Sequence, residues 1–129
     1  MIVPAGRRAG RRQALFLLYQ WDLTGQKLAS LYEGEPDEFA RALADAVSSR
    51  AVALDLRITQ SSPGWPADRL GTLERNILRI GVYELEEGTV PHEVAINEAV
   101  VLAKRYASED AARLVNGILG RVAREEDAA

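Results

Sequence analysis

The chain has 129 residues, enough for one compact domain, and its lack of cysteine excludes a disulfide scaffold, a thiolate zinc site and a cysteine nucleophile. The formal net charge is -3, but residues 1–12 hold four arginines and no acid, while the other 117 residues carry 12 bases against 19 acids. An acidic body repels nucleic acid over most of its surface, so contact with a polyanion is expected at the basic end.

No segment of the sequence is predicted to span a membrane or to act as a secretory signal. The apolar stretch from Ala14 to Tyr19 is shorter than a secretory signal and far shorter than the roughly 20 residues that span a bilayer. A membrane-surface role for the first helix is disfavoured, because its apolar residues suit a core and the acidic body repels anionic lipid. The absence of cysteine fits a reducing compartment, so a cytoplasmic protein is expected.

Apolar residues recur with helical spacing along almost the whole chain, which predicts an all-α bundle forming a single domain. The predicted segments of the N-terminal half are a flexible basic arm at 1–9, a helix from about Gly10 to Gly25, a second helix from about Pro36, and a short helix at 67–71. The stretch SSPGWP (61–66) is expected to end the second helix, because its two prolines and its glycine cannot continue it.

Three more helices are predicted in the C-terminal half, at 72–87, 91–106 and 108–124, with a frayed tail at 125–129. The residues expected to begin or end them are Thr72, Gly88, Pro91 and Ser108. The stretch from Val94 to Ala103 is apolar on almost every face, which places its helix at the centre of the bundle. Gly117 is expected to allow a close approach between two helices.

Catalytic groups are scarce. His92 is the only histidine, and the acids Glu84, Glu86 and Glu87 have no neighbouring nucleophile or base in the sequence. The chain has no glycine-rich phosphate loop and no metal-ligand spacing. We therefore predict a protein that is not an enzyme and that carries no metal or cofactor.

The arginines near the N-terminus are the main functional signal: Arg7, Arg8, Arg11 and Arg12. Cations at a helix N-terminus oppose the helix dipole and repel one another, so this cluster is unfavourable for stability alone. The cluster is either a solvated arm that pairs with acidic residues elsewhere in the protein or a binding site for phosphates. The planar guanidinium group, with its fork of hydrogen-bond donors, suits phosphate. Arg8 and Arg12 share a helix face, and Tyr19 is either a stacking surface or a core residue. The combination favours single-stranded RNA over a duplex.

Two further groups are weaker signals. Lys104 and Arg105 end a predicted helix, where cations complement the dipole, so this pair alone indicates no function. Arg75, Arg79 and Tyr83 are spaced at four and form a ridge with Glu74 beside it. The ridge is either a polar face with Tyr83 half-buried or an interface with a protein partner, since arginine and tyrosine are enriched at such sites.

Three long motifs in the C-terminal half resemble the NusB family of transcription antitermination factors: "LERNILRIGVYEL" (73–85), "VPHEVAINEAVVLAKRYA" (90–107) and "LVNGIL" (114–119). The arginines followed by "ALFLLYQWDLTG" resemble the start of the same family. This resemblance covers residues 7–25 and 70–124, and between them only the helical pattern agrees. It implies an all-α fold of about six or seven helices arranged as two small antiparallel bundles.

The resemblance also implies a function. Members of the family have no enzymatic activity and bind the boxA element of nascent ribosomal RNA leaders. Their partner is NusE, which is also a small-subunit ribosomal protein, and the pair joins RNA polymerase antitermination complexes. Some relatives form homodimers, so the free protein is either a monomer or a homodimer.

The resemblance and the patches together give two predicted sets of site residues. The RNA-binding set is Arg7, Arg8, Arg11, Arg12, Tyr19, Lys104, Arg105, Asp110 and Leu114. The partner-binding set is Glu74, Arg79, Tyr83 and Glu84.

The chain also departs from the family pattern. The departures are at Tyr106-Ala107, where Phe-Gly is usual, at Ala111 and Leu114, where Ser and Phe are usual, and at Gly120, where Asp is usual. Leu114 removes an aromatic ring that could stack on RNA. The same domain occurs at the front of certain rRNA cytosine methyltransferases, so the alternative is the RNA-recognition domain of a truncated methyltransferase, since 129 residues leave no room for a cofactor-binding domain.

Overall fold

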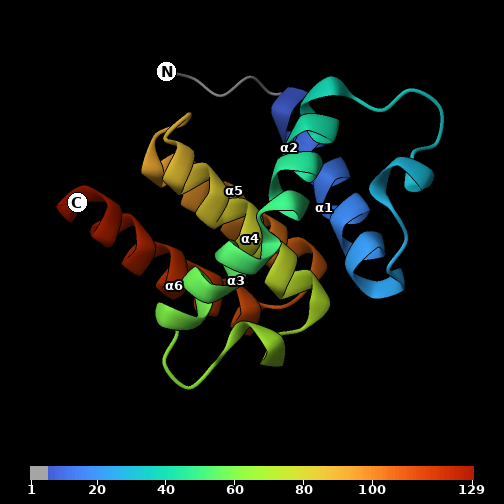
Figure 1. The fold of residues 1–129 in the computed structure, drawn as a ribbon. Helices are drawn as coiled ribbons and strands as arrows, with labels where there is room; N and C mark the ends of the chain where they lie inside the picture. Colours follow the sequence, from blue (N-terminus) through green and yellow to red (C-terminus); the bar gives the residue numbers. More distant parts are fainter. Residues whose placement is uncertain (1–5) are drawn as a thin grey trace.

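The computed structural model describes residues 6–129, and these form helices and no strand. The α-helices are α1 (Gly6–Thr24), α2 (Glu38–Ser49), α3 (Ala51–Gln60), α4 (Thr72–Glu87), α5 (His92–Tyr106) and α6 (Glu109–Ala128). Two short 3-10 helices, η1 (Leu28–Leu31) and η2 (Ala67–Arg69), lie in the connections. The predicted all-α class is confirmed. Figure 1 shows α1 and α2 side by side, with α5 and α6 forming a second pair; both pairs contact α4.

Helix α1 begins earlier than the sequence predicts. The predicted flexible arm is wrong for residues 6–9, which are helical, and residues 1–5 lie outside the described part of the chain. Two contacts explain the extra turn: Arg7 lies over the ring of Phe39 on α2, and Arg8 bonds Glu98 on α5. These contacts offset the unfavourable placement of cations at the helix start. The predicted end is correct, because Gly25 follows the helix with a φ of +73°.

The second predicted helix is two helices. Asp37 caps α2 by accepting a hydrogen bond from the Ala40 amide at 2.9 Å. The chain breaks at Arg50, whose φ of -108° and ψ of 10° lie outside the helical range. The break allows α2 to pack against α1 while α3 packs against α4. The short helix predicted at 67–71 is observed as η2.

The central helix is α4, and the prediction that α5 lies at the centre is wrong. Every residue of α4 from Asn76 to Leu85 is buried except Tyr83, which is half-buried, whereas Val101 on α5 is exposed. Helix α4 also contacts each of the other five α-helices. Its sequence does not look central because it includes arginine and glutamate, which enter the core only when paired.

The close approach between helices occurs at Gly81, and the prediction for Gly117 is wrong. A methyl group added at Gly81 would lie 2.6 Å from Leu119 Cδ1 on α6, so only glycine lets the helices approach this closely. Gly117 is exposed, with open space at the same position. The Leu119 side chain of α6 therefore packs directly against Gly81 of α4.

The helix ends of the C-terminal half follow the sequence closely. Ser108 caps α6, since its hydroxyl accepts from the Ala111 amide at 2.9 Å, and Gly88 ends α4 with a φ of +66°. The caps of α4 and α5 are Gly71 and Pro91, so the predicted N-cap at Thr72 is one residue late.

The predicted frayed tail is wrong, because α6 continues to Ala128. Arg57 on α3 bonds Glu126 at 2.7 Å, and His92 Nδ1 lies 3.3 Å from Asp127 Oδ1. These contacts fix the last turns to the rest of the fold. None of the helices in residues 6–129 is both long enough and apolar enough to cross a lipid bilayer.

Candidate nucleic-acid interface

Arginines of α1 and α5 meet in a cleft between these two helices, which we call the basic cleft. Its volume is about 170 Å³, and it is lined by Arg8, Arg11, Arg12, Glu98, Val101, Leu102, Arg105 and Tyr106. The fold therefore brings together the N-terminal arginines and Arg105, which are far apart in the sequence. Lys104 is exposed beside Arg105 but does not line the cleft.

Arg8 lies at the rim of the basic cleft. Its side chain is 68% exposed, and its Nε donates to Glu98 Oε1 at 2.9 Å. The other two guanidinium nitrogens form no hydrogen bond within residues 6–129. An exposed ion pair of this kind is worth about 1 kcal/mol or less, so a phosphate can replace or share the contact.

Arg11 is buried and has a different role. Its Nε lies 2.9 and 3.1 Å from the two carboxylate oxygens of Glu84, and its Nη2 donates to Glu84 Oε2 at 2.6 Å. Burial alone would lower the pKa of Arg11, but the hydrogen bond and charge of Glu84 outweigh it and raise the pKa above its usual value. Arg11 and Glu84 therefore neutralise each other inside the protein. The predictions of Arg11 as a phosphate ligand and Glu84 as a partner contact do not fit this burial.

Two cations of the basic cleft remain uncompensated. Arg12 is half-buried and Arg105 is exposed, and neither forms an ion pair with another side chain of the described chain. The Arg105 guanidinium lies 5.4 Å from the centre of the Tyr106 ring. Together with Arg8, these side chains give the cleft a local positive charge on an acidic protein.

Phe16 is a candidate contact that the sequence reasoning missed. It is 41% exposed, and its ring meets the edge of Tyr106 with the ring centres 5.0 Å apart. The signal was its spacing, since Arg8, Arg12 and Phe16 are four residues apart and follow one ridge of α1. Tyr19 is half-buried and does not line the basic cleft.

Arg7 does not line the basic cleft and points toward Phe39, whose ring centre also lies 5.5 Å from the Arg11 guanidinium. Arg7 lines a cavity of about 230 Å³ together with Phe39, Tyr83 and Glu84. Its guanidinium lies 5.1 Å from the centre of the Phe39 ring. An arginine predicted to bind RNA thus lies beside Tyr83, which was predicted to bind the partner.

Asp110 and Leu114 lie in a third place, which we call the Trp65 groove. Its volume is about 410 Å³, and its lining includes Trp65, Arg69, Leu70, Glu74, Asp110 and Leu114. The predicted RNA contacts of α6 and the predicted partner contact Glu74 therefore share one groove. Neither Asp110 nor Leu114 lines the basic cleft.

The ridge predicted as a partner surface is partly internal. Arg79 is buried, and its Nε and Nη2 donate to Asp55 at 2.7 and 2.6 Å. Arg79 Nη1 also bonds Asp22 at 3.0 Å, and Arg75 Nη2 bonds the same Asp22 oxygen at 2.7 Å. Arg79 connects α1, α3 and α4, so its predicted role as an exposed partner contact is wrong. Tyr83 remains half-buried, with the Arg50 guanidinium 5.4 Å from its ring centre.

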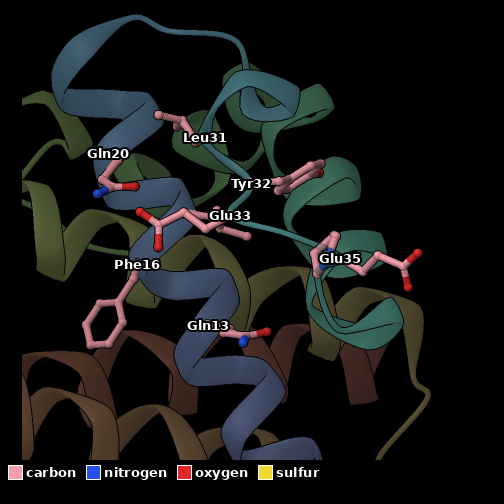
Figure 2. A pocket seen from close by; sticks show the side chains of 9 residues that line it. Gln13, Phe16, Gln20, Leu31, Tyr32, Glu33 and Glu35 are labelled. Carbon is pink, nitrogen blue, oxygen red and sulfur yellow. The ribbon is translucent and has the colours of Figure 1, made fainter.

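A further cavity of about 280 Å³ lies between α1 and the segment that leads to α2. Figure 2 shows Glu33 lying over α1, with Glu35 farther along the same segment and the ring of Phe16 turned away from Glu33. Its lining includes two carboxylates and no cation. This cavity is therefore unsuited to a polyanion. No group of three His, Asp or Glu side chains in residues 6–129 is arranged to hold a metal ion.

Comparison with known proteins shows which protein family the chain is related to. A sequence profile described as the NusB family matches residues 8–124. A protein named Transcription antitermination protein NusB from Rubrobacter xylanophilus is 41% identical, over 88% of this chain and 86% of its own length. Among solved structures, that of T. maritima NusB has a TM-score of 0.81 and 30% identity to this chain, and the match covers 100% of each chain.

A further solved structure is described as antitermination factors NusB and NusE in complex with dsRNA. It has a TM-score of 0.80 and 30% identity to this chain, and it covers 92% of this chain and 96% of its own. The profile match, the relatives and the common fold agree. The chain belongs to the NusB family.

Proposed function

We propose that this chain is a transcription antitermination factor that binds RNA at the basic cleft and has no enzymatic activity. The observation that supports this most is the convergence of Arg8, Arg12 and Arg105 on one cleft of an acidic protein. The relative from Rubrobacter xylanophilus, aligned over 86% of its own length, is named for antitermination. This favours an antitermination factor over the RNA-recognition domain of an rRNA cytosine methyltransferase.

The proposed ligand is a single-stranded RNA of the boxA type in nascent rRNA leaders. Phe16 and Tyr106 stand at one end of the ridge that carries the arginines, and aromatic rings in such places stack on unpaired bases. Because the solved NusB and NusE complex contains dsRNA, duplex RNA is a necessary comparison in any test.

The proposed protein partner is NusE, with which the chain would join RNA polymerase in the cytoplasm. The solved complex that matches this fold contains NusB and NusE. Of the four residues predicted for this contact, Glu74 and Tyr83 are accessible, whereas Arg79 and Glu84 are buried in ion pairs. We therefore assign Glu74 and Tyr83 to the partner surface and give Arg79 and Glu84 a structural role.

Fluorescence anisotropy with short labelled RNAs tests the proposal. The probes are a boxA single strand, a shuffled strand of the same composition and the boxA duplex, each with and without NusE. We expect the boxA strand to bind most tightly and NusE to raise its affinity by roughly fivefold or more, the usual range for coupled sites. Equal affinity for the three RNAs, unchanged by NusE, would contradict the proposal.

A further inference from the structure

Trp65 is a large aromatic residue that the core does not use. It lies in the turn between α3 and η2 and is 54% exposed. Tryptophan is usually well buried, because its large surface makes burial strongly favourable. An exposed ring of this size forfeits that stabilisation, so a role in contacting a ligand explains its position better than packing does.

The backbone under Trp65 is fixed. Its amide donates to the Ser62 carbonyl at 2.9 Å, and the Ser62 hydroxyl lies 2.7 Å from the Trp65 carbonyl oxygen and 2.6 Å from that of Ile58. Gly64 supplies the left-handed turn just before it, with a φ of +86°. The ring is therefore carried on a preorganised turn, and a ligand that binds it does not have to order a loose loop.

The groove beneath Trp65 has the chemistry of a site for a base. Leu70 and Leu114 supply apolar surface, the Arg69 guanidinium offers donors, and the carboxylate of Asp110 offers acceptors. An unpaired base needs a flat surface for its face and donors and acceptors for its edge. The volume of about 410 Å³ is in the range of small-molecule sites.

The groove lies close to the basic cleft along the chain. Tyr106 lines the cleft and Asp110 lines the groove, and only Ala107, Ser108 and Glu109 separate them. Four residues of chain span at most about 14 Å. A strand that leaves the cleft past Tyr106 therefore needs only a short distance to reach Trp65.

We propose that Trp65 is a stacking platform for a base of the single-stranded RNA whose phosphates lie in the basic cleft. The inference rests on the proposed function and adds to it a contact from the segment 26–69, which contains none of the predicted site residues. Trp65 and Leu114 line the same groove. RNA is favoured over a protein occupant because the groove lies only a short distance from the basic cleft and its polar groups suit one base edge.

Substitution at Trp65 tests this with the boxA strand as probe. We expect W65A and W65L to weaken binding roughly 5- to 150-fold, the range measured for loss of one base–aromatic stack. The salt dependence of binding should stay the same, because the ring neutralises no phosphate. W65F should recover part of the affinity, since it keeps a ring that leucine lacks.

The matched control is V52A, which truncates an exposed apolar side chain on α3 outside the groove and should leave RNA affinity unchanged. A second readout comes from W21F, which leaves Trp65 as the single tryptophan. Addition of the boxA strand should quench its fluorescence. Circular dichroism and thermal melting confirm that each variant is folded.

The outcomes are distinct. If the unsubstituted protein binds no RNA, the proposed function fails and the stacking role fails with it. If it binds RNA and W65L binds equally well, the stacking proposal alone is overturned. Loss of NusE binding by W65L with RNA affinity retained would overturn it too, and would identify the groove as a protein contact.

Discussion

Arginines that look alike in the sequence have different surroundings in the fold. Arg11 is buried against Glu84, Arg8 is exposed beside Glu98, and Arg12 has no carboxylate partner within residues 6–129. Arg7 turns toward Phe39 on α2 and does not line the basic cleft. The helical spacing predicts that Arg8 and Arg12 share a face, but it cannot reveal Glu84 or Glu98, which are more than 70 residues away in the chain.

Arg11 should be a stability residue. R11A leaves the Glu84 carboxylate buried without its partner, and breaking a buried pair in this way costs about 3–5 kcal/mol. Urea unfolding followed by circular dichroism should show the loss, while R12A should change the free energy of unfolding by about 0.5 kcal/mol or less. An R11A protein as stable as the unsubstituted protein would show that the pair does not hold α1 to α4.

At the scale of the helices, several helix ends follow from the sequence and the packing order does not. Gly25, Gly88 and Ser108 mark ends of helices by local backbone and capping chemistry, which needs no tertiary information. The central place of α4 depends on partners for its charged residues that come from α1 and α3. Hydrophobic periodicity counts those charges as surface, and for this reason it favoured α5.

The packing of α4 on α6 predicts opposite effects for two glycine substitutions. G81A places a methyl group 2.6 Å from Leu119 Cδ1, and overpacking of this kind costs about 1–3 kcal/mol. G117A enters open space on an exposed helix face and should stabilise the protein by up to about 1 kcal/mol. Thermal melting of the two variants should show shifts in opposite directions. Equal shifts would mean that α4 and α6 do not approach closely at Gly81.

At the scale of the whole molecule, α1 is joined to α4 by ionic contacts as well as by apolar packing. Asp22 on α1 accepts hydrogen bonds from Arg75, Asn76 and Arg79 on α4. Burial alone would raise the pKa of Asp22, but these hydrogen bonds and the two arginine charges outweigh it and lower the pKa below its usual value.

The lowered pKa gives the stability a defined dependence on pH. A carboxyl group with a depressed folded-state pKa stabilises the protein above its unfolded-state pKa of about 4, and the stabilisation is lost as pH falls through the folded-state pKa. Urea unfolding between pH 7 and pH ~2 should therefore show a fall in stability below pH ~4. D22N should be less stable at neutral pH and should lose less stability over the acidic range. The same acid dependence in D22N would contradict this role of Asp22.

The fold class could be predicted from the sequence, whereas the arrangement of the candidate site depends on how the helices pack. Helical periodicity predicts the all-α class, and the motifs at 73–85, 90–107 and 114–119 indicate the family. Arg8 and Arg12 meet Arg105 because α1 and α5 both pack against α4, and the sequence alone does not show it. Asp110 and Leu114 lie in the Trp65 groove and not in the basic cleft, and this too is set by helix packing that the sequence alone does not show.

The central claim is that the guanidinium groups of the basic cleft bind RNA phosphates. The direct measurement is the salt dependence of boxA-strand binding by R12A/R105A, compared with R121A/R124A, which removes two arginines from the far part of α6. Each lost phosphate contact should reduce the log–log slope by about 0.7, so R12A/R105A should lose about 1.4 and R121A/R124A should keep the original slope. An unchanged slope in R12A/R105A, or an equal reduction in both proteins, would contradict binding at the basic cleft.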